Sequence, residues 1–551
     1  MRFFVVFLAF APLCGVFGLW PLPRTLQTGT TVLKLAPNFD IHVNIQHAPS
    51  DLSDAVSRTK SHLKNDKLGR LVVGRGSSDS AAIQHAKSLA SLKVTLSKGA
   101  TVRSITEEAR VSIETRSEEY SLTLPADGSA ATLTANSTLG LYRGITTFEQ
   151  LWYQWSSNVY TVEAPVVIID SPAYPWRGFM LDTSRSFFPV SDIMRTLDAM
   201  SMVKMSQFHW HVSDSQSFPL EVPGYTELAN KGAYDPSMIY SPSDVKDIVD
   251  YAGARGIDVV VEIDTPGHTS IISAAHPEHI ACPVASPWSD FAAEPPSGQL
   301  RLASASTTNF TAGLFSAVAK MFPSTILSTG GDEVNANCYE KDAETQADLR
   351  AAGRTIEQAL DVFTQKTHGA IISEGKTPAV WEEMVLDHNI TLSNNTIVLV
   401  WISSANAAAV AKKNFRLVHG PSDYFYLDCG AGEWIGKTAG SNSWCDPFKS
   451  WQKAYTFDPQ ANISQSQAHL VLGGEQLLWA EQSGPENLDS IVWPRAATSA
   501  EVFWSGPGGN ASEALSRLHD VAFRMRQRGI RAIQLQPMWC ALRPGACNID
   551  S

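Results

Sequence analysis

The sequence has no excess of basic residues and, beyond its amino-terminal residues, no long hydrophobic run. Lys and Arg number 43 against 55 Asp and Glu, a formal net charge of −12, and this charge opposes binding to a phosphate backbone or an anionic membrane. No later stretch approaches the ~18 apolar residues that a membrane-spanning helix needs. We therefore expect no nucleic-acid partner and no membrane partner. With 44% hydrophobic residues, the chain has the composition of a globular protein.

The amino-terminal residues have the pattern of a secretory signal. Met1 and Arg2 precede an apolar run over residues 3–16, and the small residue Gly18 follows. This pattern is typical of a cleaved signal peptide; a buried amino-terminal helix is the alternative. We predict a signal peptide over residues 1–18 and a secreted, extracellular protein, with a vacuolar or lysosomal-type compartment as the other destination.

Cysteines and sequons agree with export. Six cysteines remain once Cys14 is removed with the signal, and an even number in an exported chain favours disulfides over free thiols. Proximity in sequence favours the pairs Cys282–Cys338, Cys429–Cys445 and Cys540–Cys547. Six N-x-S/T sequons indicate a glycosylated surface: Asn136, Asn309, Asn389, Asn394, Asn462 and Asn510.

The chain divides into two regions with different hydrophobic periodicity. Up to about residue 170, period-two alternation and helical spacing are mixed, which favours a small α+β domain with an antiparallel sheet. Residues 171–175 contain two prolines and mark the boundary, so we predict an accessory domain over 19–172 and a catalytic domain over 173–551. Within the first region, the predicted strands are 111–115 and 120–124, and the predicted helices are 79–93 and 138–152.

After residue 176, short apolar runs alternate with helical segments, such as the one that we expect Ser191 to cap. Eight such units match a (β/α)₈ barrel with long loops. A doubly wound open sheet is the alternative, but no glycine-rich phosphate loop follows the first strand. The predicted strands are 178–181, 207–212, 257–263, 325–327, 379–381, 397–401, 416–418 and 471–479.

Polar and aromatic residues gather where these strands end, the edge at which barrel enzymes place their active sites. Any one of them has a structural explanation, a helix cap for an acid or a core position for a Trp. Together they predict a bowl for a sugar ring, with indoles against its C–H face and charged groups on its hydroxyls. They are Asp182, Arg185, His209, His211, Asp214, Glu262, Asp264, His268, Asp332, Glu333, Trp381, Trp401, Trp479 and Glu481.

The adjacent acids Asp332 and Glu333 are the sharpest local signal. Gly330 and Gly331 precede them and permit a tight turn that directs both acids into one pocket. Two carboxylates in a partly dry site do not ionise together easily, so one retains its proton near neutral pH, as glycosidic bond cleavage requires. The alternative is that Asp332 caps the next helix and only Glu333 is functional.

Seven motifs together resemble the β-N-acetylhexosaminidases of glycoside hydrolase family 20. They occur in the family's order from about residue 170 to 540, and the upstream region is similar to the family's accessory domain. The segment from Tyr426 to Cys445 resembles the secreted fungal branch. The motifs are residues 176–185 (WRGFMLDTSR), 208–214 (FHWHVSD), 264–268 (DTPGH), 330–334 (GGDEV), 380–382 (VWE), 425–428 (FYLD) and 473–481 (GGEQLLWAE).

The resemblance implies an exo-acting enzyme that removes terminal non-reducing β-linked N-acetylglucosamine or N-acetylgalactosamine from chitooligosaccharides or glycans. It implies a retaining mechanism in which the substrate's own 2-acetamido oxygen forms an oxazolinium ion. Glu333 corresponds to the general acid/base and Asp332 to the residue that orients the acetamido N–H and stabilises the growing charge. Tyr426 corresponds to the hydroxyl that holds the acetamido oxygen.

The resemblance also implies substrate contacts, no cofactor, no metal, and a homodimer. Arg177, Asp428 and Glu481 correspond to residues that hold the hydroxyls of the terminal sugar, and Asp214 and His268 to groups that tune Glu333. The indoles implied to enclose the acetamido group and sugar ring are Trp381, Trp401 and Trp479.

Two positions depart from the family pattern. Ser328 stands where the signature often has His, a change that resembles the fungal branch and lies outside the acid pair. Cys429 follows Asp428, so no cation is available there, and we expect no strong preference for sulfated or otherwise anionic sugars.

Three other functions compete with this interpretation. A metal-dependent hydrolase would use His209 and His211 as ligands, with His268, Asp264 and His419 nearby. A carbohydrate-binding protein without activity should lack Glu333, Asp332 or Tyr426, and all three are present. An endo-acting chitinase should carry a D-x-D-x-E series on one strand, which the sequence lacks.

Overall fold

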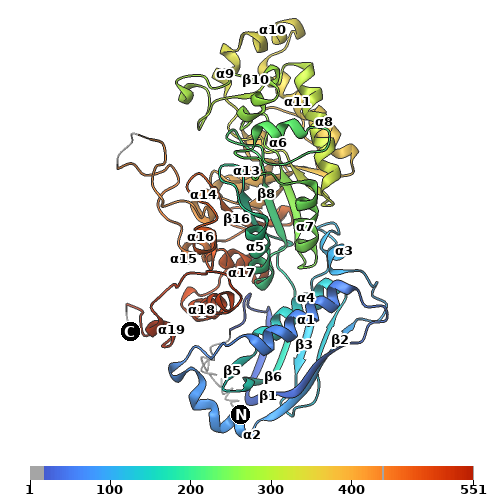
Figure 1. The fold of residues 1–551 in the computed structure, drawn as a ribbon, viewed down its shortest axis with the longest axis vertical. Helices are drawn as coiled ribbons and strands as arrows, with labels where there is room; N and C mark the ends of the chain where they lie inside the picture. Colours follow the sequence, from blue (N-terminus) through green and yellow to red (C-terminus); the bar gives the residue numbers. More distant parts are fainter. Residues whose placement is uncertain (1–17, 437–439, 550–551) are drawn as a thin grey trace, which may run out of the picture.

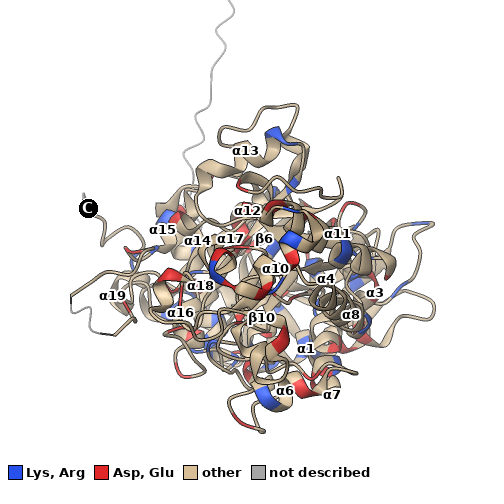
Figure 2. Cartoon of the chain, turned by 90° about the horizontal axis from the view of Figure 1, so that it is seen from above, with Lys and Arg blue, Asp and Glu red and all other residues tan. Residues whose placement is uncertain are grey.

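The computed structural model describes residues 18–436 and 440–549 (Figure 1). The predicted signal peptide therefore lies, except for Gly18, outside the described residues. Among the helices that the structure describes, none has the length and apolar character needed to cross a bilayer. In the view of Figure 2, basic and acidic residues are interspersed over the surface.

The amino-terminal domain is built on a six-stranded sheet with helices packed on it (Figure 1). The predicted antiparallel sheet is a mixed one, because β1–β2 and β2–β4 pair in parallel. Helix α1 (Ser50–Asn65) lies between β1 and β2 in the chain, and such a crossover lets the second strand run in the same direction as the first. The strand order is β1 (Thr25–Val43), β2 (Lys87–Leu96), β4 (Ala131–Ala135), β3 (Tyr120–Leu124), β6 (Asn158–Asp170) and β5 (Tyr153–Trp155).

Two local predictions in this domain were wrong. Residues 111–115 form a turn rather than a strand, since the amides of Thr115 and Arg116 both donate to the Ser112 carbonyl. The helix predicted over 79–93 ends after α2 (Ser80–His85), and strand β2 follows because it pairs with β1 and β4. The helix predicted over 138–152 corresponds to α4 (Thr138–Gln150), which Ser137 caps.

The second domain, which the sequence predicts to be catalytic, is a closed barrel of eight parallel strands, as predicted. Strand β16 pairs with β7 in a continuous register from Gly473↔Trp176 to Leu478↔Leu181, which closes the sheet and excludes the open doubly wound alternative. The strands are β7 (Trp176–Asp182), β8 (Gln207–His211), β9 (Asp258–Glu262), β12 (Ile326–Ser328), β13 (Thr377–Trp381), β14 (Ile397–Val400), β15 (Arg416–His419) and β16 (Val471–Leu478).

Helices surround the barrel and bury their apolar faces against it. Helix α5 begins at Val190 after Pro189 and has no side-chain cap, so the predicted cap at Ser191 was wrong. The principal outer helices are α5 (Val190–Met202), α7 (Pro242–Gly253), α8 (Ala305–Met321), α11 (Ile356–Ser373), α13 (Ala407–Lys412), α17 (Ala497–Ser505) and α18 (Ala511–Gln527). Shorter elements are α3 (Ile105–Ala109), α6 (Thr226–Gly232), α9 (Ala336–Lys341), α10 (Ala343–Ala352), α12 (Glu383–Leu386), α14 (Ser422–Phe425), α15 (Trp451–Tyr455), α16 (Leu488–Val492), α19 (Met538–Ala541), β10 (Ile280–Ala281) and β11 (Gln299–Leu300).

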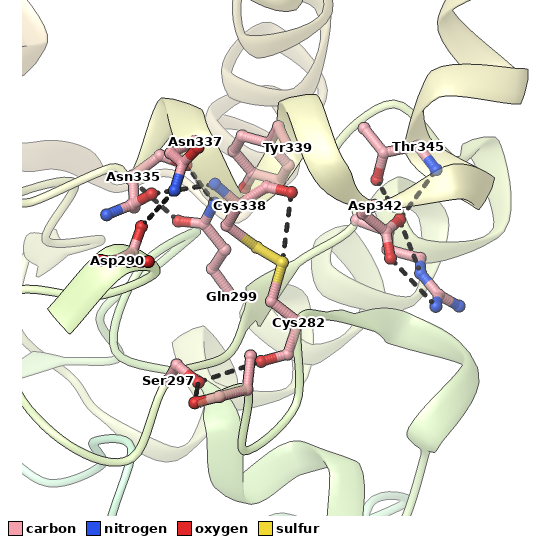
Figure 3. The surroundings of a disulfide bond; sticks show 12 residues. Cys282, Asp290, Ser297, Gln299, Asn335, Asn337, Cys338, Tyr339, Asp342 and Thr345 are labelled. Carbon is pink, nitrogen blue, oxygen red and sulfur yellow. Dashed lines mark hydrogen bonds and ion pairs between the residues drawn. A yellow bond between two sulfur atoms is a disulfide. The ribbon is translucent and has the colours of Figure 1, made fainter. Parts of the chain in front are cut away.

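The three predicted disulfides are present. Cys282–Cys338, Cys429–Cys445 and Cys540–Cys547 have Cα–Cα separations of 5.9, 5.4 and 5.7 Å. Cys282 follows β10 and Cys338 lies on α9, so the first bridge ties a long loop after β9 to the helix that follows the acid pair (Figure 3).

A buried ionic network joins the two domains at the amino-terminal end of the barrel. Glu118, from the accessory domain, accepts hydrogen bonds from Arg143 of α4 at 2.7 Å and from Arg177 of β7 at 2.6 Å. Burial by itself would raise the pKa of Glu118, but Arg177 and Arg143 lower it to about 2. Glu118 is therefore a carboxylate that stabilises the domain contact.

Candidate active site

A cavity of about 440 Å³ opens where the barrel strands end. Eight of the predicted site residues line it: His268, Asp332, Glu333, Trp401, Tyr426, Asp428, Trp479 and Glu481. Asp214 and Trp381 lie behind this wall, where Asp214 contacts His268 and Trp381 contacts Trp479. The structure thus brings together all the predicted catalytic and sugar-binding residues except Arg177.

Arg177 does not reach the cavity, so the prediction that it holds the sugar hydroxyls was wrong. It is the second residue of β7, is 0% exposed, and donates to Glu118 and to the carbonyls of Tyr174 and Lys204. Active-site residues of a barrel follow the carboxyl ends of its strands, so a residue at the start of β7 lies at the opposite end. Arg185, three residues after β7, lines the cavity instead.

Arg185 is held by carboxylates. Its Nη1 lies 2.9 Å from Asp214 Oδ2 and 3.3 Å from Asp182 Oδ2, and its Nε donates to Glu294 at 3.0 Å. Burial by itself would lower the pKa of Arg185, but Asp214, Glu294 and Asp182 raise it well above its usual value. The guanidinium also stacks over the Trp479 ring, 5.1 Å from its centroid, so its orientation is fixed.

Two cavity residues carried no catalytic signal in the sequence. Glu294 comes from the long loop between β10 and β11, far from any strand end, and only tertiary structure brings it to Arg185. Trp444 lies next to Cys445 in the second disulfide, and its exposed ring packs edge-on against Trp401 and Tyr426. A helical or strand pattern does not predict either contact, because both residues lie in loops.

The backbone after β12 directs the two neighbouring acids toward the same place. Gly330 and Gly331 have φ values of +65° and +104°, and a Cβ at Gly330 would lie only 1.8 Å from Asp264 Oδ1. Glu333 itself adopts φ +53°, a strained conformation that is typical of functional sites. Glycine is therefore required at 330 for the turn that presents the pair.

Asp332 does not cap the following helix. Helix α9 begins at Ala336 and is capped by the side chain of Asn335, which accepts from the Cys338 amide. Asp332 is buried, whereas 30% of the Glu333 side chain is exposed to the cavity. The alternative in which Asp332 acts only as a cap is excluded by this geometry.

The pKa of Asp332 is raised well above its usual value, first by burial and then by the neighbouring Asp264 carboxyl, while His268 opposes the shift. Burial also raises the pKa of Asp264 to about 7, again against the effect of His268. These buried acids therefore bind a proton more tightly than free carboxyls do. Ionising both at once is unfavourable.

His268 connects the acid pair to the barrel interior. Its Nε2 lies 3.2 Å from Glu333 Oε2 and 3.7 Å from Asp332 Oδ2, and its Nδ1 lies 3.0 Å from Asp214 Oδ1. Burial would lower the pKa of His268, but Asp214 and Asp332 raise it well above its usual value. His268 is thus an imidazolium that faces both carboxyls of the acid pair.

The same line of contacts continues through the barrel core. His211 lies 2.8 Å from Asp214 and 2.6 Å from Glu262, and His209 lies 3.1 Å from Glu262 and 2.8 Å from Glu475. Each of these two imidazoles therefore uses both nitrogens on carboxylates. Burial would lower their pKa values, but these carboxylates raise the pKa of His209 to about 9 and that of His211 to about 10.

This arrangement contradicts the metal-hydrolase interpretation of His209 and His211. A metal ligand must be a neutral imidazole with a free nitrogen, whereas both side chains are cations whose N–H groups are already bound. His419, the third histidine in that interpretation, contacts the Pro459 carbonyl and the Phe457 ring. His209 and His211 belong to the carboxylate network instead.

Aromatic rings form one side of the cavity. Trp401 stacks on Tyr426 with an interplanar angle of 12°, and Tyr426 and Trp381 each contact Trp479 at a centroid distance of 6.2 Å. The Trp401 indole donates to Glu383 at 2.8 Å, which fixes its plane. Burial raises the pKa of Tyr426 well above its usual value, so its hydroxyl remains a proton donor.

Carboxyl groups also line the cavity, and two of them have an oxygen without a hydrogen-bond partner in the part of the chain that the structure describes. Burial raises the pKa of Asp428 to about 7 and that of Glu481 well above its usual value, although Arg185 opposes the latter shift. Among the residues described, Asp332 Oδ1 and Asp428 Oδ1 are buried without a hydrogen-bond partner. Since buried polar atoms normally have partners, these oxygens are suited to receive polar groups of a ligand.

Residues 174–507 match the model of the glycosyl hydrolase family 20 catalytic domain, and residues 19–151 match a "beta-acetyl hexosaminidase like" model. A beta-hexosaminidase of Arthroderma benhamiae is 36% identical over 453 residues, which are 78% of this chain and 74% of that protein. The chain belongs to glycoside hydrolase family 20. This membership makes it a glycoside hydrolase, and its relatives include fungal proteins.

Other family members show how far the likeness extends. The chitooligosaccharidolytic beta-N-acetylglucosaminidase of Bombyx mori is 33% identical over 97% of this chain and 90% of that protein. The crystal structure of the Flavobacterium johnsoniae chitobiase superposes with a TM-score of 0.75 at 26% identity, over 94% of this chain and 74% of that one. The family assignment therefore covers both domains.

Proposed function

We propose that this family 20 enzyme is an exo-acting β-N-acetylhexosaminidase that removes terminal β-linked N-acetylhexosamine from chitooligosaccharides or glycans. The observation that carries the proposal is the placement of Asp332 and Glu333 together at the Nε2 atom of His268, 3.7 and 3.2 Å away, at a cavity lined by Tyr426 and Trp479. The names of the relatives point to the same class of substrate.

In the first step, the 2-acetamido oxygen of the substrate attacks its anomeric carbon and the bond to the leaving oxygen breaks. Glu333 transfers its proton to that oxygen, and the partly exposed position of its side chain gives it access to the leaving group. The Tyr426 hydroxyl donates to the acetamido oxygen and holds it in the attacking position. The product is an oxazolinium ion.

Asp332 stabilises that ion. Its carboxylate accepts the acetamido N–H, and the positive charge that grows on the ring favours its ionised form against burial and Asp264. In the second step, Glu333 accepts a proton from water, which opens the oxazolinium ring from the face that the leaving group vacated. Two successive inversions retain the anomeric configuration.

The closed end of the cavity selects a terminal sugar. Arg185, Asp428 and Glu481, which line the cavity with the acid pair, supply one donor group and two carboxyls for sugar hydroxyls. Trp381, Trp401 and Trp479 enclose the acetamido group and the sugar ring.

Hydrolysis of paired chromogenic substrates tests the proposed function directly. A β-N-acetylglucosaminide should be cleaved readily, whereas the matching plain β-glucoside should not, because the glucoside lacks the internal nucleophile. Comparable rates on the two substrates would contradict the mechanism. Unchanged activity after treatment with EDTA would separate it from metal-dependent hydrolysis.

Arg177, on β7, and Arg185, three residues after that strand, should respond differently to substitution by lysine. Arg185→Lys keeps the charge but loses the planar fork, so kcat/KM should fall about tenfold or more, and the melting temperature should also fall because Asp182 and Asp214 are buried. Arg177→Lys should lower the melting temperature, because Glu118 is buried and loses its fitted partner, and should leave KM unchanged. Steady-state kinetics and thermal melts of the two variants measure the contrast, and a raised KM for Arg177→Lys would contradict the assignment.

Anionic sugars should be poor substrates. The acidic side chains of Glu294 and Glu433 line the cavity, and Cys429 is buried in a disulfide after Asp428. A sulfate brought among these groups is repelled by about 1–2 kcal/mol at moderate distances, so a 6-sulfated N-acetylglucosaminide should be hydrolysed about tenfold more slowly than the neutral one. Equal rates would refute this expectation.

We also propose that the protein is a secreted glycoprotein with an accessory domain over 19–172 and a catalytic domain over 173–551. The three disulfides support an oxidising compartment, and all six sequon asparagines are exposed, which permits glycan attachment. Mass spectrometry of the secreted protein, with and without glycosidase treatment, tests both points. The homodimer stays a prediction from the resemblance, which analytical ultracentrifugation would test.

A further inference from the structure

A second histidine cluster lies outside the cavity, on the short 3₁₀ turn Pro277–His279 and the residue before it. The sequence there is His276-Pro277-Glu278-His279. Residues i and i+3 of a 3₁₀ turn eclipse one another, so His276 and His279 project from the same side. Their ring centroids are 5.7 Å apart, and both rings pack against Phe310 of α8, at 4.9 and 4.4 Å.

One nitrogen of each imidazole contacts a polar side chain of a neighbouring helix. His276 Nε2 lies 3.0 Å from Glu227 Oε1, and His279 Nδ1 lies 3.1 Å from the Thr307 hydroxyl. A hydrogen bond at one ring nitrogen sets the tautomer and leaves the lone pair on the other nitrogen. In this cluster the remaining atoms are His276 Nδ1 and His279 Nε2.

The Glu278 carboxylate lies between those two nitrogens. Its Oε1 is 3.2 Å from His276 Nδ1 and 3.9 Å from His279 Nε2, and the three atoms all lie within 4.8 Å of one another. Tetrahedral ligands at about 2.1 Å from zinc are about 3.4 Å apart. Because Glu278 is exposed, its side chain can adjust toward a shared ion.

We propose that His276, Glu278 and His279 bind one divalent cation of the zinc type, with water completing the coordination. Two imidazole nitrogens and one carboxylate suit zinc and its first-row neighbours, whereas calcium and magnesium prefer oxygen ligands throughout. Glu227 and Thr307 supply the outer hydrogen bonds that metal-binding histidines characteristically have. In His209 and His211 both nitrogens are held by buried carboxylates, whereas the Nδ1 atom of His276 contacts the exposed Glu278, which is itself a proposed ligand.

The position of this site gives the cation a structural role. The turn leads directly into β10 and Cys282, and the Arg301 amide after β11 donates to the His279 carbonyl at 2.8 Å. The loop between β10 and β11 carries Glu294 to the active-site cavity. A bound cation and the Cys282–Cys338 bridge (Figure 3) would together fix the base of this loop.

Titration of the intact, EDTA-treated and buffer-exchanged protein with ZnCl₂ tests the proposal. Calorimetry or equilibrium dialysis with metal analysis should show one saturable equivalent per chain with low-micromolar affinity. The melting temperature should rise with zinc and return after EDTA, because binding to the folded state alone stabilises it. Absence of saturable binding below millimolar zinc would overturn the proposal.

Variants assign the site. His279→Ala should abolish the saturable equivalent, and Glu227→Gln should weaken binding about tenfold by removing the outer carboxylate. His388→Ala is the matched control, because that histidine contacts a single glutamate, Glu357, and it should retain one equivalent. If His279→Ala does not fold, Glu278→Gln replaces it, and full binding by a folded variant of either ligand would refute the site.

Discussion

Glu333→Gln is expected to lower kcat by roughly 10³-fold on a substrate with a poor leaving group such as a second sugar. Positioned acid/base groups contribute about 10²–10⁴-fold, and glutamine cannot supply the proton that the departing oxygen needs. A substrate whose leaving group is an acidic phenol needs little protonation, so its first step should be largely restored. Steady-state kinetics on the two substrates measure the ratio.

Glu340→Gln is the matched control for this experiment. Glu340 is an exposed glutamate on α9, outside the active-site cavity, and its replacement should leave both rates unchanged. An equal loss on good and poor leaving groups for Glu333→Gln would contradict its assignment as the proton donor.

Asp332→Asn is expected to lower kcat by about 10²–10³-fold, the loss of roughly 2.7–4 kcal/mol seen when one preorganised partner of a developing charge is removed. Asparagine has the shape of the carboxylate but no charge to place beside the oxazolinium ring. Because the ring is formed by the substrate itself, KM should change much less than kcat.

The same substitution should stabilise the fold. The pKa of Asp332 is raised by burial and by Asp264, and a carboxyl whose folded pKa is raised destabilises the protein above its unfolded pKa. That destabilisation grows as the pH rises from the unfolded pKa toward the folded pKa, and it disappears as the pH falls below the unfolded pKa. Thermal melts at pH 7 and at pH 4 should therefore show Asp332→Asn more stable than the wild type only at the higher pH. Full activity in this variant would contradict the substrate-assisted mechanism.

Opposite demands on Asp332 explain why the surrounding polar network is so extensive. The substrate reaction requires a carboxylate at a buried position, and burial alone opposes one. His268 counters the shift, and Asp214 holds His268 through its other nitrogen. Behind Asp214, the His211 side chain lies between the Asp214 and Glu262 carboxyls. Each acidic group in this line therefore contacts a basic one.

Much of the barrel was predictable from the chain. Each of the eight apolar runs found after residue 176 corresponds to a barrel strand, because a strand buried on both faces needs continuous apolar residues. In the accessory domain the strand predicted at 120–124 and the helix predicted at 138–152 were confirmed, but residues 87–93 have helical spacing and form part of β2. Pairing with β1 and β4 satisfies that segment's backbone, and such non-local bonds are invisible in a short sequence window.

Motif order and strand ends together determined the enzyme family, the acid pair and most of the cavity wall, because residues at consecutive strand ends of a barrel must converge. The choice between Arg177 and Arg185 could also have been made from the sequence, since only the second follows its strand. Glu294, Trp444 and the contacts of His276 were decided by tertiary structure alone. Loop side chains have no periodicity that specifies their direction, and only the folded chain determines which partners they meet.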